Sequence, residues 1–441
     1  MSHVVILGGG LAGTLAAAAV APYMDKVTVL ERDALSSGPA ARPGVPQARH
    51  SHMLWSGGAQ AVESLVPGTI ERLLVTGARK IQMTADAAWL AGSGWLRRTP
   101  GRHYVITCSR DLLDWVLREQ ALLTAPEISL RTRTQAIGLV GSSQRVTGVS
   151  VRDHVTGATE TLHADLVVDA TGRTSKAGHW LTELGLTAIP ETVVNWRAGY
   201  ASRRFRAPSN MDRAFPLVLI QPDFLTTGPV RAAGVWPIEE GQWQVTLLGA
   251  HGGEPDARQK RQEGFAAFAR SARHPLVADL IAHAEPLGPV HLVRHMRWRR
   301  RHCTGLAHRW PDGFAVLGDA AATFNPVLAQ GMAVAALSAV ALREQLHHGH
   351  QPAFSRRLQQ AIDRTTRRAW TTGQVLNLLY LAPKPSLAVR LIRRCAVRAF
   401  DASSDWPVLH NALYDVLSSS APITTVLAPR PVLAGIWGRR R

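Results

Sequence analysis

The chain has 441 residues, of which 46% are hydrophobic and 19% charged, a balance that favours a globular protein and excludes a disordered one. The net charge of +18 is carried almost entirely by scattered arginines, and no helix-turn-helix, zinc-finger, RRM or KH pattern accompanies it. We therefore expect no nucleic acid among the partners, and an anionic membrane or an acidic protein fits such charge better.

A glycine-rich turn follows the first predicted strand. Residues 3–7 are apolar and β-branched, residues 11–20 predict an Ala- and Leu-rich helix, and residues 26–30 predict a second strand. In such a β-α-β unit, G-x-G-x-x-G is typical of dinucleotide binding. Its glycines permit the turn, the approach of a pyrophosphate and close helix packing, and an acid after the second strand binds ribose. These positions are Gly8, Gly10, Gly13 and Glu31.

Two later stretches return to the same predicted sheet. Residues 165–175 form a buried strand that runs into a small-residue turn, DATGRTS. Residues 313–321 form another strand that delivers Asp319 beside a glycine, and an apolar helix begins near Gly331. An aspartate here can accept hydrogen bonds from a ribityl chain, and helix N-terminal amides can stabilise negative charge on a reduced ring. These features indicate a flavin site.

Between the last two stretches, alternating segments predict an antiparallel sheet, which we assign to substrate binding: residues 198–205, 215–221, 231–237 and 242–248. We expect apolar side chains of this sheet to line the pocket, with ordinary sheet packing as the alternative for each: Trp236, Ile238, Val245 and Leu247. The predicted organisation is a FAD-binding domain at 1–188 and 301–346, a substrate domain at 189–300, and a C-terminal helical region at 347–441.

With these three stretches in this order, residues 1–346 resemble the FAD-dependent monooxygenases of the aromatic-hydroxylase superfamily. Within it, the chain is most similar to bacterial epoxidases related to squalene epoxidase, which act on polyenes of polyether antibiotic pathways. The similarity is carried by GVPQARHSHMLWSGG at 44–58, CSRDLLDW at 108–115 and DATGR at 169–173. It implies an α/β protein with a glutathione-reductase-type fold around one FAD.

The resemblance also implies roles for individual residues. The FAD-binding set comprises Gly8, Gly10, Gly13, Glu31, Arg32, Arg49, Arg110, Asp319, Pro326, Gly331 and Met332. The glycines surround the pyrophosphate, residues 31 and 32 the adenosine, and the two later arginines the phosphates or flavin. The aspartate holds the ribityl chain, and the last three residues lie against the isoalloxazine. One departure, Leu-Ala-Gln at 328–330 where relatives often carry Tyr or Gly and a His, concerns the substrate side of the ring.

The implied chemistry needs no catalytic side chain. Reduced FAD reacts with O₂ to give a C4a-hydroperoxide, and the protein excludes water while one oxygen atom passes to an apolar alkene. Because only one dinucleotide fingerprint is present, NAD(P)H visits transiently or a partner flavin reductase supplies the electrons. The alternatives are a hydroxylase or halogenase of a secondary metabolite and a reductase of isoprenoid double bonds.

Other reactive residues lead to weaker predictions. His50 and His52 lack a third ligand, so we predict no metal site. Lys80 bears a faint similarity to the reactive lysine of flavin halogenases, but their full motif is absent, and a solvated charge is the preferred interpretation. The three cysteines form no C-x-x-C pair and predict neither disulfides nor zinc.

The C-terminal quarter is the part least matched by the resemblance. Apolar segments at 375–381, 387–392 and 426–437 lie near several arginines, a mixture typical of helices on anionic lipid. Helices that cover the FAD domain with an arginine-rich face are the equal alternative. The sequence shows neither a secretory signal peptide nor an apolar run of roughly 18 to 20 residues. We therefore predict a cytoplasmic protein, with peripheral attachment to the inner face of the membrane as the alternative.

Overall fold

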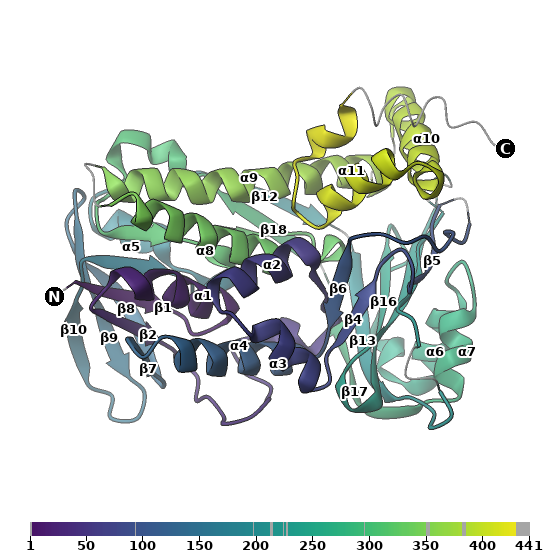
Figure 1. Ribbon diagram of the computed structural model, residues 1–441, viewed down its shortest axis with the longest axis horizontal. Coiled ribbons are helices and arrows are strands. Elements are labelled where there is room, and N and C mark those ends of the chain that lie inside the picture. Colours follow the sequence, from purple (N-terminus) through teal and green to yellow (C-terminus); the bar gives the residue numbers. More distant parts are fainter. Residues whose placement is uncertain are drawn as a thin grey trace.

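The computed structural model describes residues 2–428 apart from residues 93, 197, 212–214, 224, 226–227, 295, 350–352 and 382–384. Its centre is a five-stranded parallel sheet in the order β19-β11-β1-β2-β7 (Figure 1). The strands are β1 (His3–Leu7), β2 (Lys26–Leu30), β7 (Ile128–Arg131), β11 (Leu166–Asp169) and β19 (Phe314–Val316). Their apolar, β-branched runs are typical of parallel strands that are buried on both faces.

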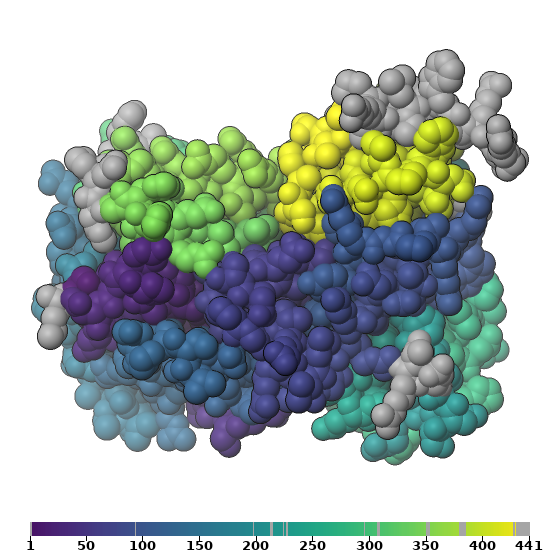
Figure 2. Space-filling model, viewed as in Figure 1, coloured from purple at the N-terminus to yellow at the C-terminus, as the bar shows by residue number. Residues whose placement is uncertain are grey.

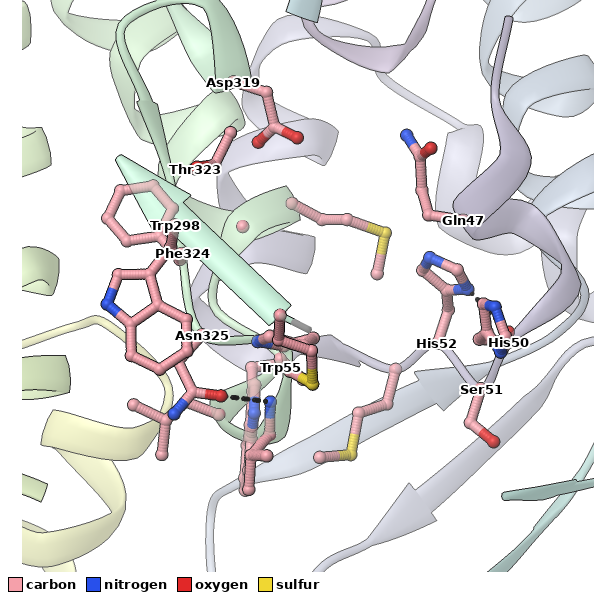
Figure 3. Close-up of a pocket in the computed structure, with 18 of the residues that line it drawn as sticks. Gln47, His50, Ser51, His52, Trp55, Trp298, Asp319, Thr323, Phe324 and Asn325 are labelled. Carbon is pink, nitrogen blue, oxygen red and sulfur yellow. Dashed lines mark hydrogen bonds between the residues drawn. The ribbon is translucent and has the colours of Figure 1, made fainter. Parts of the chain in front are cut away.

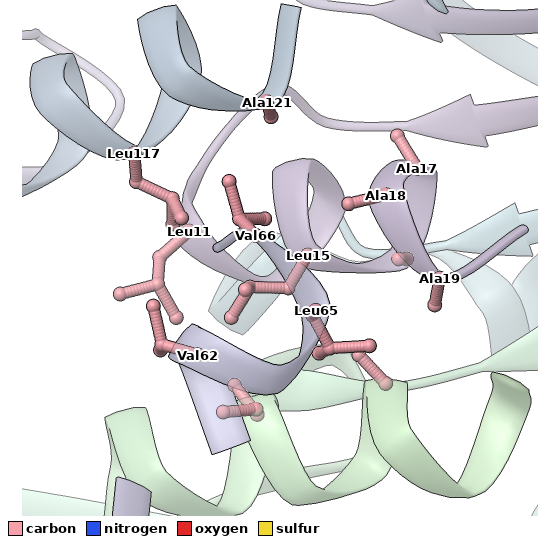
Figure 4. Packing of buried hydrophobic residues seen from close by; sticks show 14 of the residues in the cluster. Leu11, Leu15, Ala17, Ala18, Ala19, Val62, Leu65, Val66, Leu117 and Ala121 are labelled. Carbon is pink, nitrogen blue, oxygen red and sulfur yellow. The ribbon is translucent and has the colours of Figure 1, made fainter. Parts of the chain in front are cut away.

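Helices cover one face of this sheet: α1 (Leu11–Val20), α4 (Arg110–Thr124) and α8 (Gly331–His347). Their neighbours are α2 (Ser56–Leu65), α3 (Thr69–Val75) and the long α9 (Phe354–Leu381). Helix α1 is buried along almost its whole length, which its alanines allow because they let adjacent helices approach closely. Figure 4 shows Leu11 and Leu15 of α1 packed between Val62 of α2 and Leu117 of α4.

The opposite face of the parallel sheet carries a small antiparallel sheet, β10-β9-β8, and helix α5 (Ala177–Glu183). Its strands are β8 (Thr134–Gly141), β9 (Val146–Asp153) and β10 (Thr159–His163). The parallel sheet is therefore the middle of three layers.

A six-stranded sheet in the order β17-β13-β16-β15-β14-β5 forms the second half of the molecule. Its strands are β5 (Ala88–Leu90), β13 (Ala198–Arg206), β14 (Val218–Ile220), β15 (Val230–Pro237), β16 (Gln242–Ala250) and β17 (Glu285–Val293). Helices α6 (Gln262–Arg270) and α7 (Leu276–Ala282) cover one face, with Phe265 and Phe268 in a common core. The edge strand β5 comes from within residues 1–188, so the first segment of the chain contributes to this sheet.

Two smaller sheets join the halves. One, β3-β6-β4, contains β3 (Leu54–Trp55), β4 (Arg79–Gln82) and β6 (Tyr104–Thr107). The other, β12-β18-β20, contains β12 (Glu191–Trp196), β18 (Met296–Arg301) and β20 (Ala322–Thr323). Arg300 of β18 forms a buried ion pair with Asp363 of α9, with Nη2 at 2.9 Å from Oδ1, and so fixes that helix to the sheet.

The C-terminal helices α10 (Leu387–Ala402) and α11 (Pro407–Leu417) lie against the β5 and β6 region (Figures 1 and 2). Residues 429–441, which include most of the last predicted apolar segment and the terminal arginines, lie outside the described residues. Among the described residues, no helix combines the length and apolarity that a bilayer span requires. The predicted α/β fold, with its parallel core and its antiparallel sheet, is confirmed.

Candidate functional site

A cavity of about 2810 Å³ runs between the parallel sheet, the six-stranded sheet and the C-terminal helices. It is lined by most of the residues that the sequence assigned to FAD: Gly8, Gly10, Glu31, Arg32, Arg110, Asp319, Pro326, Gly331 and Met332. Figure 3 shows one part of it, with Asp319 and Thr323 on one side and Gln47 and His52 on the other.

The three glycines of the turn have different steric surroundings. Gly8 has φ +98°, and a Cβ there would lie 2.8 Å from the Ala170 carbonyl oxygen. A Cβ on Gly13 would lie 1.8 Å from the Gly8 carbonyl oxygen, so this residue allows α1 to pack against the turn. Gly10 caps α1, and a Cβ there would meet nothing within 4 Å. Gly10 therefore faces open cavity at a helix N-terminus, where an anion is stabilised.

Glu31 lies beside this turn and is buried. Its Oε2 accepts a hydrogen bond from the Gly9 N–H at 2.9 Å, and its Oε1 accepts one from the Asp33 N–H at 2.9 Å. Arg42 forms an ion pair with Glu31 and donates through Nη1 to the Gly9 carbonyl at 3.2 Å. Sequence reasoning missed Arg42, because the arginine-rich loop that carries it has no periodic pattern to identify one particular side chain.

Arg301 of β18 joins the second and third predicted stretches. Its buried guanidinium donates to the Ala320 carbonyl at 2.7 Å and to the Ser175 carbonyl at 2.9 Å. It also donates to Glu191 at 2.9 Å through Nε. The turn after β11 and the turn that carries Asp319 are therefore held together by one side chain.

Asp319 lines the cavity at the end of β19. Burial raises the pKa of its carboxyl group, and the guanidinium groups of Arg173 and Arg110 oppose that shift. Arg110 begins α4 and forms an ion pair with Asp114, with Nε at 2.7 Å from Oδ1. The carboxyl group thus lies in a partly apolar site with cations nearby, where hydrogen-bond donors of a ligand would favour its charged form.

The approach to α8 lines the next part of the cavity. Asn325 accepts a hydrogen bond from the Val327 N–H at 3.1 Å and donates to Asn377 of α9 at 2.7 Å. This holds the short 3₁₀ turn at Pro326–Leu328 in front of Gly331 and Met332. The first two residues of α8, Gly331 and Met332, therefore line the cavity.

His50 and His52 both line the cavity, and both are neutral at pH 7. Burial is the main cause that lowers the pKa of His50 to about 3 and that of His52 to about 4. His50 Nδ1 lies 2.9 Å from Ser202 Oγ, and His52 Nδ1 donates to the His50 carbonyl at 2.9 Å. In the described part of the chain, no group of three or more His, Cys, Asp or Glu could hold a metal ion.

The predicted substrate wall is partly wrong, because the two faces of β16 are opposite to the prediction and Ile238 lies beyond the end of β15. Val245 and Leu247 are fully buried in the core beneath α6 and α7, and Ile238 is buried away from the cavity. The alternate residues of β16, Thr246 and Leu248, face the cavity instead. Trp236 does line it, as predicted. Since successive side chains of a strand point to opposite faces, assigning one residue of β16 to the wrong face assigns the whole strand wrongly.

Two other predicted residues lie away from the cavity. Arg49 is exposed and is not among the lining residues, although its neighbours His50 and Gln47 are. The structure therefore does not bring Arg49 to the cavity wall, and its approach to the phosphates or flavin stays a prediction. Lys80 is exposed on β4, with Nζ 4.3 Å from the centre of the Tyr104 ring, and is likewise outside the cavity.

The residues present fit FAD. The glycine turn leaves open space at a helix N-terminus, Glu31 and Arg32 lie at its side, and the cavity continues past Asp319 to Met332. When bound, FAD supplies the activation of O₂, which no side chain can provide. The turn would hold the pyrophosphate, Asp319 the ribityl chain, and the residues before α8 the ring system.

Comparisons with known proteins agree with this geometry. A family model described as FAD dependent oxidoreductase matches residues 3–177. Protein Rv3254 of Mycobacterium tuberculosis is 31% identical over 393 residues, covering 86% of this chain and 80% of that protein. Kynurenine 3-monooxygenase of Salinispora tropica is 28% identical over 357 residues, covering 78% of this chain and 72% of the enzyme.

Two solved structures show the same fold. p-Nitrophenol 4-monooxygenase PnpA from Pseudomonas putida DLL-E4 aligns with a TM-score of 0.69 at 16% identity, covering 96% of this chain and 99% of that one. The flavin-dependent brominase Bmp2 aligns with a TM-score of 0.66 at 14% identity, covering 95% and 94%. The expectation of an FAD-dependent enzyme with monooxygenase relatives is confirmed. The epoxidase subtype stays a prediction.

Substitutions in the glycine turn should separate packing from cofactor binding. Gly13→Ala should lower the free energy of unfolding by roughly 2 kcal/mol or more and abolish bound flavin, because its Cβ collides with backbone. Gly10→Ala should keep the stability and lose FAD affinity. Flavin absorbance and urea denaturation of the purified variants measure both effects. Gly178→Ala, which also meets open space but lies on α5, is the control, and flavin loss there would contradict this assignment.

The low pKa of His50 predicts a pH dependence of stability. The unfolded chain, with an ordinary histidine pKa of 6.5, binds an additional proton between that pH and about 3. Stability should therefore fall as the pH falls through this window, by at most about 1.4 kcal/mol per pH unit from this group. His50→Gln retains a partner for Ser202 and should flatten the slope between pH 6.5 and 4.5 in urea denaturation. Equal slopes would show that His50 is not buried neutral.

Proposed function

Because the chain belongs to the FAD-dependent oxidoreductase family, we propose that it is a monooxygenase that epoxidises an apolar, alkene-containing natural product. The overall reaction consumes the alkene, O₂, NAD(P)H and one proton, and it yields the epoxide, water and NAD(P)⁺. One oxygen atom of O₂ enters the substrate and the other leaves as water. The electrons arrive from NAD(P)H directly or through a partner flavin reductase.

The observation that supports this proposal is the apolar part of the cavity, here called the chamber. It adjoins the residues before α8 and is lined mainly by large apolar side chains: Trp55, Trp89, Leu219, Trp236, Phe400 and Leu413. Such walls offer an elongated apolar molecule a large contact area. An apolar chamber beside the flavin residues is what we expect of a site that transfers oxygen to an apolar alkene.

The alternative reactions differ from epoxidation in the residues that they require and in whether oxygen enters the product. Halogenation by analogy with the halogenase lysine has no support from Lys80, which lies outside the cavity. Hydroxylation needs the same flavin residues and the same apolar chamber, so it is the main alternative to epoxidation. A double-bond reductase would share the FAD residues and would incorporate no oxygen.

The test is to supply a model polyene to the reduced holoenzyme in ¹⁸O₂ and to analyse the products by mass spectrometry. An epoxide with one ¹⁸O atom is expected. Leu219→Trp, which fills the chamber, should divert most of the consumed O₂ to H₂O₂, whereas Leu123→Trp on the exposed face of α4 should not. A labelled alcohol would establish hydroxylation instead, and a saturated, unlabelled product would establish the reductase.

We also propose that α10 attaches the protein to an anionic membrane. Its Leu387, Leu391 and Ile392 are each more than half exposed, and the arginines among them, Arg390 and Arg394, are exposed as well. Apolar side chains flanked by cations complement an anionic bilayer surface. Ile392 also lines the cavity, so this face lies at the chamber.

Flotation with vesicles that contain phosphatidylglycerol tests the attachment. The wild-type holoenzyme should float with these vesicles and not with neutral phosphatidylcholine vesicles, because the arginines supply part of the attraction. Leu391→Glu with Arg394→Glu should abolish flotation. Val155→Glu, at an exposed valine outside α10, should leave it unchanged. Equal flotation of wild type and the double variant would reject the attachment through α10.

A further inference from the structure

Helix α11 forms one wall of the chamber, although α8 ends at His347 and α11 begins only at Pro407. Four of its side chains line the cavity: Leu409, Leu413, Val416 and Leu417. The space-filling view shows the C-terminal helices seated on the segment that contains β5 (Figure 2). In agreement, the rings of Trp89 in β5 and Phe400 in α10 have centroids 5.3 Å apart.

The contact that holds this wall is built around Asp415. Arg102 Nη2 donates to both oxygens of its carboxylate at 2.7 Å, and His103 Nε2 lies 2.9 Å from Oδ1. The other ring nitrogen of His103, Nδ1, lies 3.0 Å from the hydroxyl of Ser56, the first residue of α2. We call these four residues the Asp415 anchor.

The anchor has one consistent arrangement of protons. A carboxylate can only accept, so His103 donates from Nε2 to Asp415, and its Nδ1 accepts from the Ser56 hydroxyl. Burial lowers the pKa of His103 and favours the neutral ring, while Asp415 opposes that shift. The bonds to the Asp415 carboxylate from Arg102 and His103 are of the strong, charge-assisted kind.

The anchor contains the three residue types of a hydrolytic triad, but its serine cannot act as a nucleophile. Ser56 is 2% exposed and is absent from the residues that line the cavity. The anchor instead joins α11 to the start of α2 and to the loop before β6. A Cβ on Gly57 would lie 2.5 Å from the Ser418 carbonyl oxygen, so the end of α11 fits tightly against α2.

Aromatic packing continues the anchor into the chamber wall. Tyr414, next to Asp415, is 2% exposed and stacks on His410, with ring centroids 4.6 Å apart. It also lies near His103 and Trp89, with centroids at 6.2 Å and 6.5 Å. Trp89 itself lines the chamber. A displacement of Asp415 would therefore move both α11 and the tryptophan beside it.

We propose that Asp415 is a positioning residue for substrate binding, because its contacts with Arg102 and His103 hold the α11 wall of the chamber in place. The C-terminal helices are then part of the substrate site and set the size of the molecule that it accepts. This proposal rests on one part of the proposed function, namely that the substrate binds in the chamber.

Two measurements on the FAD-loaded full chain test the proposal without any oxygen chemistry. The first is binding of Nile red, an apolar dye, followed by its fluorescence. The second is hydrogen exchange of the α11 amides. Asp415→Asn should weaken dye binding about tenfold and accelerate α11 exchange by a similar factor, with bound flavin unchanged. Arg102→Gln, at an arginine whose side chain is 61% exposed, should shift both in the same direction.

Two further variants make the result specific. Leu413→Trp fills the chamber and should prevent dye binding while α11 exchange stays as in the wild type. Glu285→Gln removes another arginine-bound carboxylate, 2.8 Å from Arg206 on the far edge of the six-stranded sheet, and should change neither readout. Unchanged dye affinity and exchange in both Asp415→Asn and Arg102→Gln would overturn the proposal. Because neither readout needs turnover, the result stands whether or not the enzyme forms epoxides.

Discussion

The parallel pairing of β1, β11 and β19 is the constraint on which the rest of the structure depends. In this register, Leu7 pairs with Asp169 and Asp169 with Val316, so three segments far apart in the chain end at one edge of one sheet. The turns that follow therefore emerge side by side. Each turn alone is a common local structure, and their juxtaposition produces a continuous surface that fits one FAD.

The side chains around these turns preserve that juxtaposition. Arg301 alone bonds to Ser175 after β11, to Ala320 after β19, and to Glu191 on β12. A buried guanidinium is costly unless its donors are satisfied, and here carbonyl and carboxylate oxygens satisfy them. Removing one of these acceptors would leave the buried guanidinium of Arg301 with an unsatisfied donor, which is costly. The network thus resists relative movement of the two turns that face the flavin site.

The FAD half could be predicted from the sequence because its signals are local. Gly8, Gly10 and Gly13 are close in the chain, so their spacing can be recognised in the sequence alone. The substrate half depends on which face of β16 meets the helices, and apolar residues on both faces conceal that choice. Val245 and Leu247 look suitable for a pocket, yet α6 and α7 cover them. Arg42 and Asp415 depend on contacts across the fold, which no local pattern encodes.

The same physical property explains the neutral histidines and the apolar chamber. Burial is the main cause that lowers the pKa of His50 and of His52, and the nearby positive charges of Arg49 and Arg110 lower these pKa values further. Arginines and the helix N-termini favour negative charge at the flavin end of the cavity, while tryptophans and leucines make the other end apolar. One end of the cavity is therefore positively charged and the other end is apolar. A charged cofactor and an apolar substrate can each occupy the end that suits it, and the C-terminal helices are needed because the two sheets alone leave the apolar end open on one side.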